Sequence, residues 1–214
     1  MAQRVFAQEK PGKSDMGDTF YTIKGEPESV TREKMSKFIA FAFRVSTVEA
    51  ARERIAEIGR RYHDARHVCW AYMLGSQRNV SMSNDNGEPS GTAGKPILGQ
   101  INSLGLTDVV VIVVRYFGGI KLGTSGLIAA YREAARSVLE MAGVVECHDM
   151  AQVRVRFPYV SMNGVMRLAK APGVEIKEQK FDNTCELLLE LRADDAPRLR
   201  GMLSGVDGCI VFDD

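Results

Sequence analysis

A chain of 214 residues can form one large domain or two of modest size, and its 45% hydrophobic and 26% charged residues allow a substantial core. No apolar run approaches the roughly 18 residues that a membrane span requires, so no membrane partner is expected. The net charge is +1, with +3 on residues 1–148 and −2 on residues 149–214, which argues against nucleic-acid binding over a broad basic surface.

The N-terminus and the cysteines indicate the compartment. The opening stretch MAQRVFAQEKPGKSDMGDTF lacks the continuous apolar core of a signal peptide, so we expect residues 1–18 to be a flexible tail. The four cysteines form no CxxC pair, which favours reduced thiols over a disulfide framework or a zinc knuckle. Together these features predict a cytoplasmic protein.

Apolar patterns predict the strands of a first domain. Residues 108–117 are mostly β-branched and apolar on both faces, which is typical of a central strand. The pattern KFIAFAFRV at residues 37–45 alternates well enough to indicate a strand, and a long polar loop follows the strand at 67–74. The expected strands are 19–24, 28–34, 37–45, 67–74 and 108–117, and the expected loop is 75–91.

Helical spacing and capping residues predict three helices between these strands. In residues 46–65, Ser46 and Glu49 form a capping box ahead of an apolar stripe. A helix over 92–103 has Pro96 in its first turn, where proline is tolerated. Another helix begins at a cap at Thr124 or Ser125 and ends at Gly143. The alternation predicts a sheet with helices packed on one face.

Residues 149–214 have a different order of elements. The segment begins with a strand at 152–159 and a helix at 159–171. A strand pair follows, joined by a turn at Asp182 and Asn183. A helix at 195–205 and a closing strand at 209–214 complete it. The order βαββαβ is that of a ferredoxin-like split fold. The expected fold class is therefore α+β, with two domains at 19–148 and 149–214.

The stretch RYFGGIKLGTSGL, residues 115–127, places four glycines between a buried strand and a helix. Free backbone N–H groups and the positive end of the helix dipole make such a corner favourable for anions. Arg115 and Lys121 add positive charge, and Thr124 adds a hydroxyl. The glycines do not follow the G-x-G-x-x-G spacing of a dinucleotide site.

A second glycine-rich stretch, SNDNGEPSGTAGKP, covers residues 83–96. Its GK pair resembles a P-loop, but Pro89 stands where that motif requires glycine, and Pro96 follows Lys95 where Ser or Thr is required. In both stretches the glycines can serve sharp corners, and the same tight geometry can leave backbone amides exposed for binding. The two interpretations are compatible.

The stretch RRYHDARHVCWAY, residues 60–72, contains His63 and His67. With Cys69, and Asp64 or His148, these histidines could bind a metal, but no fourth ligand is evident, so we expect neither a metal nor a cofactor. His63 or His67 with Asp85 or Glu88 could instead perform acid–base catalysis. That alternative is an enzyme acting on a small phosphorylated or peptide-like substrate.

Three blocks in order, HDARHVCWAY, SNDNGEPSGTAGKPIL and VVRYFGGIKLGTSGLIAAY, preceded by KMSKFIA, resemble the signature blocks of the YigZ/IMPACT family. The resemblance covers about residues 19–145, and the remainder is similar to the small C-terminal domain of the bacterial members. It implies an N-terminal β/α sandwich similar to domain IV of elongation factor G. It also implies a ferredoxin-like C-terminal domain similar to domain V of that factor.

The resemblance implies a role in translation but no catalytic residue. Eukaryotic members regulate translation through a kinase pathway that bacteria lack, so only a general link to translation or RNA carries over. We therefore expect a non-enzymatic cytoplasmic regulator that binds RNA, the ribosome or a protein partner of the translation machinery. The two glycine-rich loops should lie side by side with unpaired amides, and Arg66, Lys95, Arg115 and Lys121 should contact phosphate. The expected binding residues are His63, Arg66, His67, Asp85, Gly87, Glu88, Gly91, Thr92, Lys95, Arg115, Gly118, Gly119, Lys121, Gly123 and Thr124.

Overall fold

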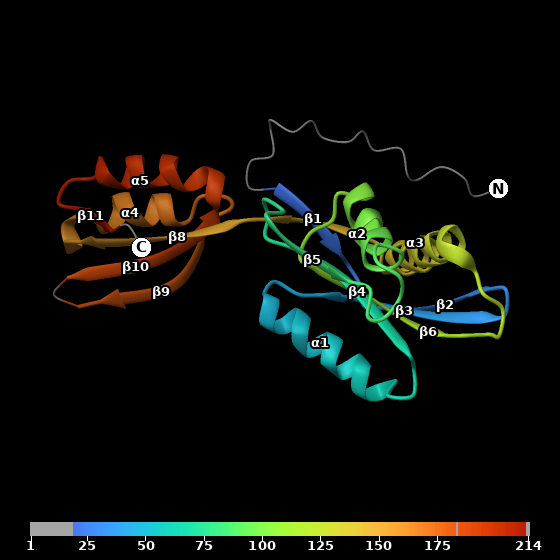
Figure 1. The fold of residues 1–214 in the computed structure, drawn as a ribbon. Coiled ribbons are helices and arrows are strands. Elements are labelled where there is room, and N and C mark those ends of the chain that lie inside the picture. The colour runs from blue at the N-terminus through green and yellow to red at the C-terminus, as the bar shows by residue number, and fades with distance from the viewer. Residues whose placement is uncertain (1–18, 183, 213–214) are drawn as a thin grey trace. The chain divides into compact units, whose positions relative to one another are not determined.

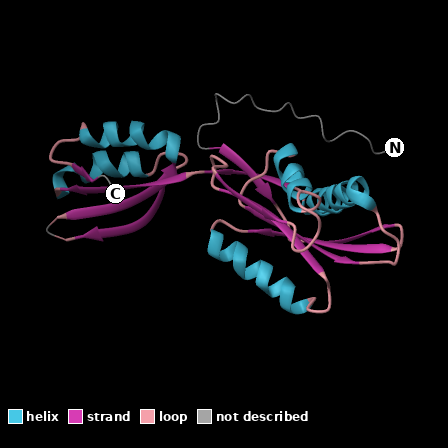
Figure 2. Ribbon diagram, in the orientation of Figure 1, coloured by secondary structure: helices cyan, strands magenta, loops and turns pink. Residues whose placement is uncertain are grey.

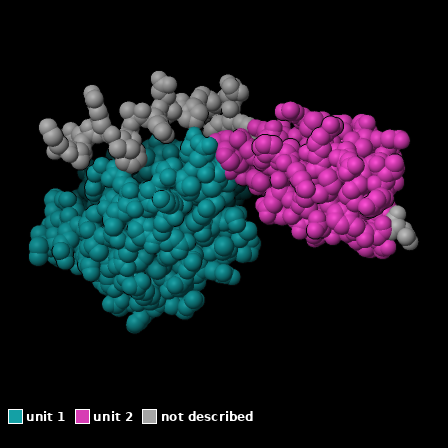
Figure 3. Space-filling view, turned by 180° about the vertical axis from the view of Figure 1, so that it is seen from behind, with its two compact units in different colours: residues 1–11, 20–147 teal, residues 12–19, 148–214 magenta. Residues whose placement is uncertain are grey.

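The computed structural model describes residues 19–182 and 184–212, which form α-helices and β-sheets in an α+β fold (Figure 2). The chain divides into two compact units (Figure 3). The described part of unit 1 is residues 20–147, and that of unit 2 is Thr19 with 148–182 and 184–212. The expected tail at 1–18 and Asn183 of the expected turn lie outside the described residues.

Unit 1 is built on a five-stranded antiparallel sheet of order β2-β3-β6-β4-β5 (Figure 1). Strand β6 is central, as its β-branched sequence predicts, and its residues 109–114 are fully buried. A separate two-stranded sheet pairs β1 with β7. The strands are β1 Thr19–Ile23, β2 Glu28–Glu33, β3 Ser36–Arg44, β4 His67–Leu74, β5 Val80–Asn84, β6 Val109–Tyr116 and β7 Val144–His148.

Strand β5 lies inside the stretch that the sequence predicted to be a loop. It pairs with β4 from Trp70 opposite Asn84 to Leu74 opposite Val80. As an edge strand it buries none of its five residues, and the alternation of Val80 and Met82 with serines is too short to stand out within a polar stretch. The expected loop at 75–91 is therefore wrong over residues 80–84.

Helices cover both faces of this sheet, which corrects the expectation of helices on one face only (Figure 1). Helix α1, Val48–Arg61, packs on the face formed by residues such as Phe41 and Ile112. Helices α2, Gly94–Ser103, and α3, Gly123–Ala142, pack on the opposite face. Because successive residues of the buried strands are apolar, each face needs its own cover.

The helix ends differ in detail from the sequence expectation. Thr47, not Ser46, caps α1, and its Oγ1 accepts a hydrogen bond from Ala50 N at 3.1 Å. Helix α3 begins at Gly123 without a side-chain cap, so the expected cap at Thr124 or Ser125 is wrong. Gly143, with φ 67°, follows α3 as predicted. No helix in the described ranges is both long and apolar enough to cross a membrane.

Unit 2 has the element order β8-α4-β9-β10-α5-β11 and a four-stranded antiparallel sheet of order β11-β8-β10-β9. Its core contains inward-facing strand residues such as Val155 and Leu187, packed against Val165 of α4 and Leu199 of α5. The elements are β8 Met150–Phe157, η1 Tyr159–Ser161, α4 Met162–Ala169, β9 Glu175–Phe181, β10 Cys185–Arg192, η2 Ala193–Asp195, α5 Ala196–Ser204 and β11 Ile210–Phe212.

One glycine of the corner after β6 is required by close packing. Gly118 lies against the turn between β2 and β3, and a Cβ built on it would collide with the backbone of Met35. Its N–H also donates to Ser36 Oγ at 3.4 Å. Since a backbone neighbour cannot move aside as a flexible side chain does, this position tolerates only glycine.

Replacing Gly118→Ala should therefore lower the free energy of unfolding by about 2 kcal/mol or more. The matched control is Gly59→Ala in α1, where a Cβ meets no atom within 4 Å; it should be neutral or stabilise by up to about 1 kcal/mol. Urea unfolding followed by circular dichroism measures both changes. Equal stability of the two variants would contradict the proposed backbone contact.

Candidate functional site

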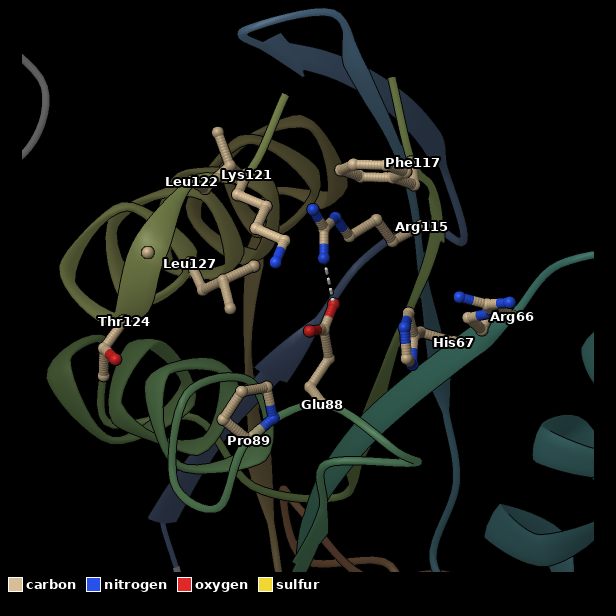
Figure 4. A pocket seen from close by; sticks show the side chains of 11 residues that line it. Arg66, His67, Glu88, Pro89, Arg115, Phe117, Lys121, Leu122, Thr124 and Leu127 are labelled. Carbon is tan, nitrogen blue, oxygen red and sulfur yellow. Dashed lines mark hydrogen bonds and ion pairs between the residues drawn. The ribbon is translucent and has the colours of Figure 1, made fainter. Parts of the chain in front are cut away.

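A pocket of about 390 Å³ opens on unit 1 where the two glycine-rich loops meet (Figure 4). The loop after β5 contributes Glu88 and Pro89, and the corner between β6 and α3 contributes Lys121. Figure 4 shows Lys121 pointing into the pocket and His67 on its opposite side. The lining residues are Arg66, His67, Glu88, Pro89, Arg115, Phe117, Lys121, Leu122, Gly123, Thr124 and Leu127.

A buried ion pair forms the floor of the pocket. Arg115 Nη1 lies 2.6 Å from Glu88 Oε1, and the two side chains are only 7% and 3% exposed. Tyr131 donates to the same oxygen at 2.8 Å, and Arg115 Nη2 donates to Ser36 Oγ at 3.4 Å. Arg115 Nε is buried without a hydrogen-bond partner in the described part of the chain. The charge of Arg115 is thus compensated inside the protein, and this side chain is not a free cation.

The polar network extends beneath the pocket to Cys69. Its Sγ lies 3.3 Å from Tyr131 Oη and donates to Asp85 O at 2.9 Å. Burial raises the pKa of Cys69 to about 12 and raises the pKa of Tyr131 far above its usual value. Among the described residues, no three His, Cys, Asp or Glu side chains form a group that could hold a metal. The alternative metal site with Cys69 is therefore not assembled.

The second glycine-rich loop is filled by its own carboxylate. Asp85 Oδ1 accepts from Ala93 N and Gly94 N at 2.9 and 2.8 Å, and Oδ2 accepts from Gly91 N at 2.8 Å. Burial favours the neutral acid, but these hydrogen bonds and the charge of Lys95 outweigh it and lower the pKa of Asp85. The expectation of unpaired amides is wrong for this loop, because an internal anion already occupies the start of α2.

The first loop has the opposite character. No described side chain caps the N-terminus of α3, and Gly123 and Thr124 of its first turn line the pocket. Lys121 and Arg66 are exposed and make no ion pair within the described residues. Of the two loops, only this one offers an uncapped helix end to an anion, with the exposed cations Lys121 and Arg66 beside it.

Several predicted residues lie outside the pocket. His63 is exposed in the turn after α1, and the would-be Cβ of Gly87 faces the His67 ring at 3.4 Å. Thr92 Oγ1 donates to Pro89 O at 2.6 Å, so it stabilises the loop itself. Gly91 and Lys95 line a second depression. The remaining three, Asp85, Gly118 and Gly119, do not line the pocket.

These positions bear on the enzymatic alternative. Of its four acid–base candidates, the pocket contains His67 and Glu88 but neither His63 nor Asp85. Asp85 is engaged by three amides, and Glu88 by Arg115 and Tyr131. The sequence interpretation missed the apolar lining residues Pro89, Phe117, Leu122 and Leu127. Their position next to the glycines was the only signal that could have indicated them.

Residues 34–139 of this chain, which include both glycine-rich loops and the pocket between them, match the Impact N-terminal domain family. The chain belongs to the IMPACT family. It is 44% identical over 170 residues to IMPACT family member YvyE of Bacillus subtilis, covering 78% of this chain and 77% of that protein. It is 33% identical over 151 residues to YigZ of Escherichia coli, covering 69% and 74%. A crystal structure of a hypothetical protein aligns with a TM-score of 0.68 and 25% identity, over 93% of this chain and 98% of that one.

Replacing Glu88→Ala should cost about 3–5 kcal/mol of unfolding free energy, because Arg115 would stay buried without a counter-charge. The control is Glu140→Ala, which removes an exposed partner of Arg136 and should cost no more than about 0.5 kcal/mol. Chemical denaturation of both variants measures the difference. A loss below about 1 kcal/mol for Glu88→Ala would be inconsistent with the ion pair described here.

Replacing Asp85→Asn should destabilise the protein by about 2 kcal/mol at neutral pH, because an amide cannot replace a carboxylate that accepts three hydrogen bonds. The folded-state pKa of Asp85 lies below its ordinary value of 3.8, so its stabilisation is complete above that value and is lost as the pH falls through the folded pKa. The gap between wild type and variant should therefore narrow in strong acid. Urea titrations at several pH values, with Glu53→Gln as the control, test this; a gap independent of pH would refute it.

Proposed function

We propose that this IMPACT family protein is a cytoplasmic, non-enzymatic regulator associated with translation, which binds RNA phosphate at the pocket of unit 1. The observation that carries the proposal is the meeting of the uncapped N-terminus of the 20-residue helix α3 with Lys121 and Arg66 at one cavity. The partial positive charge at a helix N-terminus and its free N–H groups favour a phosphate there.

The surroundings of the pocket favour RNA as the source of the phosphate. Phe117, which lines the pocket, is 53% exposed, and Ile120 in the same corner is 51% exposed. Exposed aromatic side chains beside cations are the groups on which unpaired bases stack. Because only a few cations gather here and the net charge of the chain is +1, we expect weak binding that falls with salt.

The proposal also includes the fold types of the two units. The order of elements in unit 2 and its strand order β11-β8-β10-β9 support a ferredoxin-like domain. The likeness of unit 1 to domain IV of elongation factor G is implied by the family resemblance and remains a prediction. Because such a likeness indicates an RNA-facing role only by analogy, the proposed RNA binding rests on the geometry of the pocket.

The pocket favours binding over catalysis. A general base must lie within hydrogen-bond reach of the proton that it removes, with a lone pair free to accept it. Asp85 is engaged by backbone amides, and the Oε1 atom of Glu88 is engaged by Arg115 and Tyr131. His67 Nδ1 lies 2.9 Å from Asn86 O, which orients its ring. These contacts position the loop, and among the described residues no hydrogen bond joins His67 to Glu88 or Asp85 as an acid–base pair.

Reversing the charges of Lys121→Glu and Arg66→Glu together should weaken binding of a labelled single-stranded RNA of about twelve nucleotides by at least about tenfold at low salt. The log–log salt slope should fall by about 0.7 for each lost phosphate contact. The control is Arg52→Glu with Arg60→Glu, on the exposed surface of α1. Fluorescence anisotropy measures both variants.

Equal affinity of the Lys121/Arg66 variant and the wild type would overturn the proposed surface. Ribosome co-sedimentation is a separate measurement for the protein-binding alternative. If the protein binds no free RNA but co-sediments with ribosomes after nuclease treatment, its partner is a protein and the RNA assignment is wrong.

A further inference from the structure

A second depression, of about 490 Å³, lies between α2 and α3. It contains two exposed cations, Lys95 of α2 and Arg132 of α3. Neither makes an ion pair in the part of the chain that the structure describes. Its lining residues are Gly91, Lys95, Pro96, Gly99, Gln100, Ile128 and Arg132. The function proposed above uses Lys121 and Arg66 and leaves this depression unexplained.

The depression and the pocket share one side of helix α3. Thr124 lines the pocket, while Ile128 and Arg132, four and eight residues further on, line the depression. Residues four apart are neighbours on one face of a helix. At 1.5 Å per residue, Thr124 and Arg132 are about 12 Å apart along the helix axis. The two sites therefore follow each other along one helix face.

The charges around the depression favour an anionic occupant. Arg136, one turn beyond Arg132, is paired with Glu133 and Glu140, but Arg132 is not. The acidic group that acts on Lys95 is Asp85, and its two oxygens accept hydrogen bonds from backbone amides. Asp85 keeps its negative charge and offsets part of the charge of Lys95, so the excess positive charge at the depression comes mainly from exposed Arg132, with a smaller contribution from exposed Lys95.

We propose that the pocket and the depression are two phosphate subsites of one track for single-stranded RNA along α3. The inference rests on the function proposed above and adds that the ligand is a polymer. A small phosphorylated molecule would fill one subsite and leave the other cations unused. Stacked nucleotides advance about 3.4 Å each along a strand, so about 12 Å corresponds to three or four steps. The apolar neighbours, Phe117 at the pocket and Ile128 at the depression, suit unpaired bases, which a duplex keeps inside its stack.

The test compares two RNAs. One of about two nucleotides is too short to reach both subsites, and one of about eight is long enough to do so. For the wild type, the longer RNA should bind at least about tenfold more tightly. Arg132→Glu and Lys95→Glu, tested singly, should each remove most of that gain, so that the longer RNA binds them little more tightly than the short one. Arg52→Glu on α1 is the charge-matched control and should change neither affinity. Thermal melting of each variant confirms that it is folded.

The outcomes separate this inference from the proposed function. If the Lys121/Arg66 variant loses RNA but Arg132→Glu and Lys95→Glu bind the longer RNA like the wild type, the track is wrong and the proposed function stands. If the wild type binds the short RNA as tightly as the longer one, a single subsite accounts for binding, so the track is refuted and the proposed function stands. If the wild type binds no RNA at all, the proposed function fails and the track fails with it.

Discussion

The ion pair between Arg115 and Glu88 is the interaction on which the pocket depends. It joins the end of β6 to the loop after β5, and Tyr131 ties α3 to the same carboxylate oxygen. Removing two charges from water costs several kcal/mol per ion, which only close geometry and further hydrogen bonds offset. Three segments distant in the sequence are therefore held in fixed positions relative to one another, and the cavity between them has a defined shape. Because the charges of the ion pair cancel each other, the exposed cations around the rim determine the sign of the electrostatic potential in the pocket.

The two glycine-rich loops look alike in sequence but differ in how their backbone amides are used. In the loop before α2, Asp85 accepts three of them, so the protein supplies its own anion at this corner. At the start of α3 no described side chain performs this task. The first arrangement builds a rigid wall, while the second leaves a helix dipole directed at the cavity. A single carboxylate thus distinguishes a corner whose amides the protein occupies itself from one whose helix end it leaves uncapped.

Short-range patterns predicted most of the elements of unit 1, because periodicity reports which residues are buried. The wholly apolar run of β6 and the apolar stripe of α1 are examples. The edge strand β5 escaped detection because it is exposed and has only two apolar residues, Val80 and Met82, within a polar stretch. The cap of α1 was placed one residue early, at Ser46 and not Thr47, because either side chain is a good cap and only backbone geometry decides between them.

The site was predictable as a group of residues but not as a set of contacts. Family blocks and glycine spacing led to both loops, and the structure does bring them to one pocket. They gave no indication that Arg115 would pair with Glu88, 27 positions away, or that Asp85 would close its own loop. Those contacts depend on side-chain direction after folding, which residue types and spacing do not contain. A positive residue in a signature block is therefore weak evidence of a free charge.

The buried thiol beneath the pocket has a further consequence for chemistry. Because burial raises the pKa of Cys69 to about 12, its sulfur is held as the thiol at neutral pH and the reactive thiolate is rare. Its sulfur is also enclosed by Tyr131 and the carbonyl of Asp85. Oxidants and alkylating agents have access to it only when the layer between the sheet and α3 opens. The rate at which Cys69 reacts with such reagents therefore reports how often the packing between the sheet and α3 opens beneath the pocket.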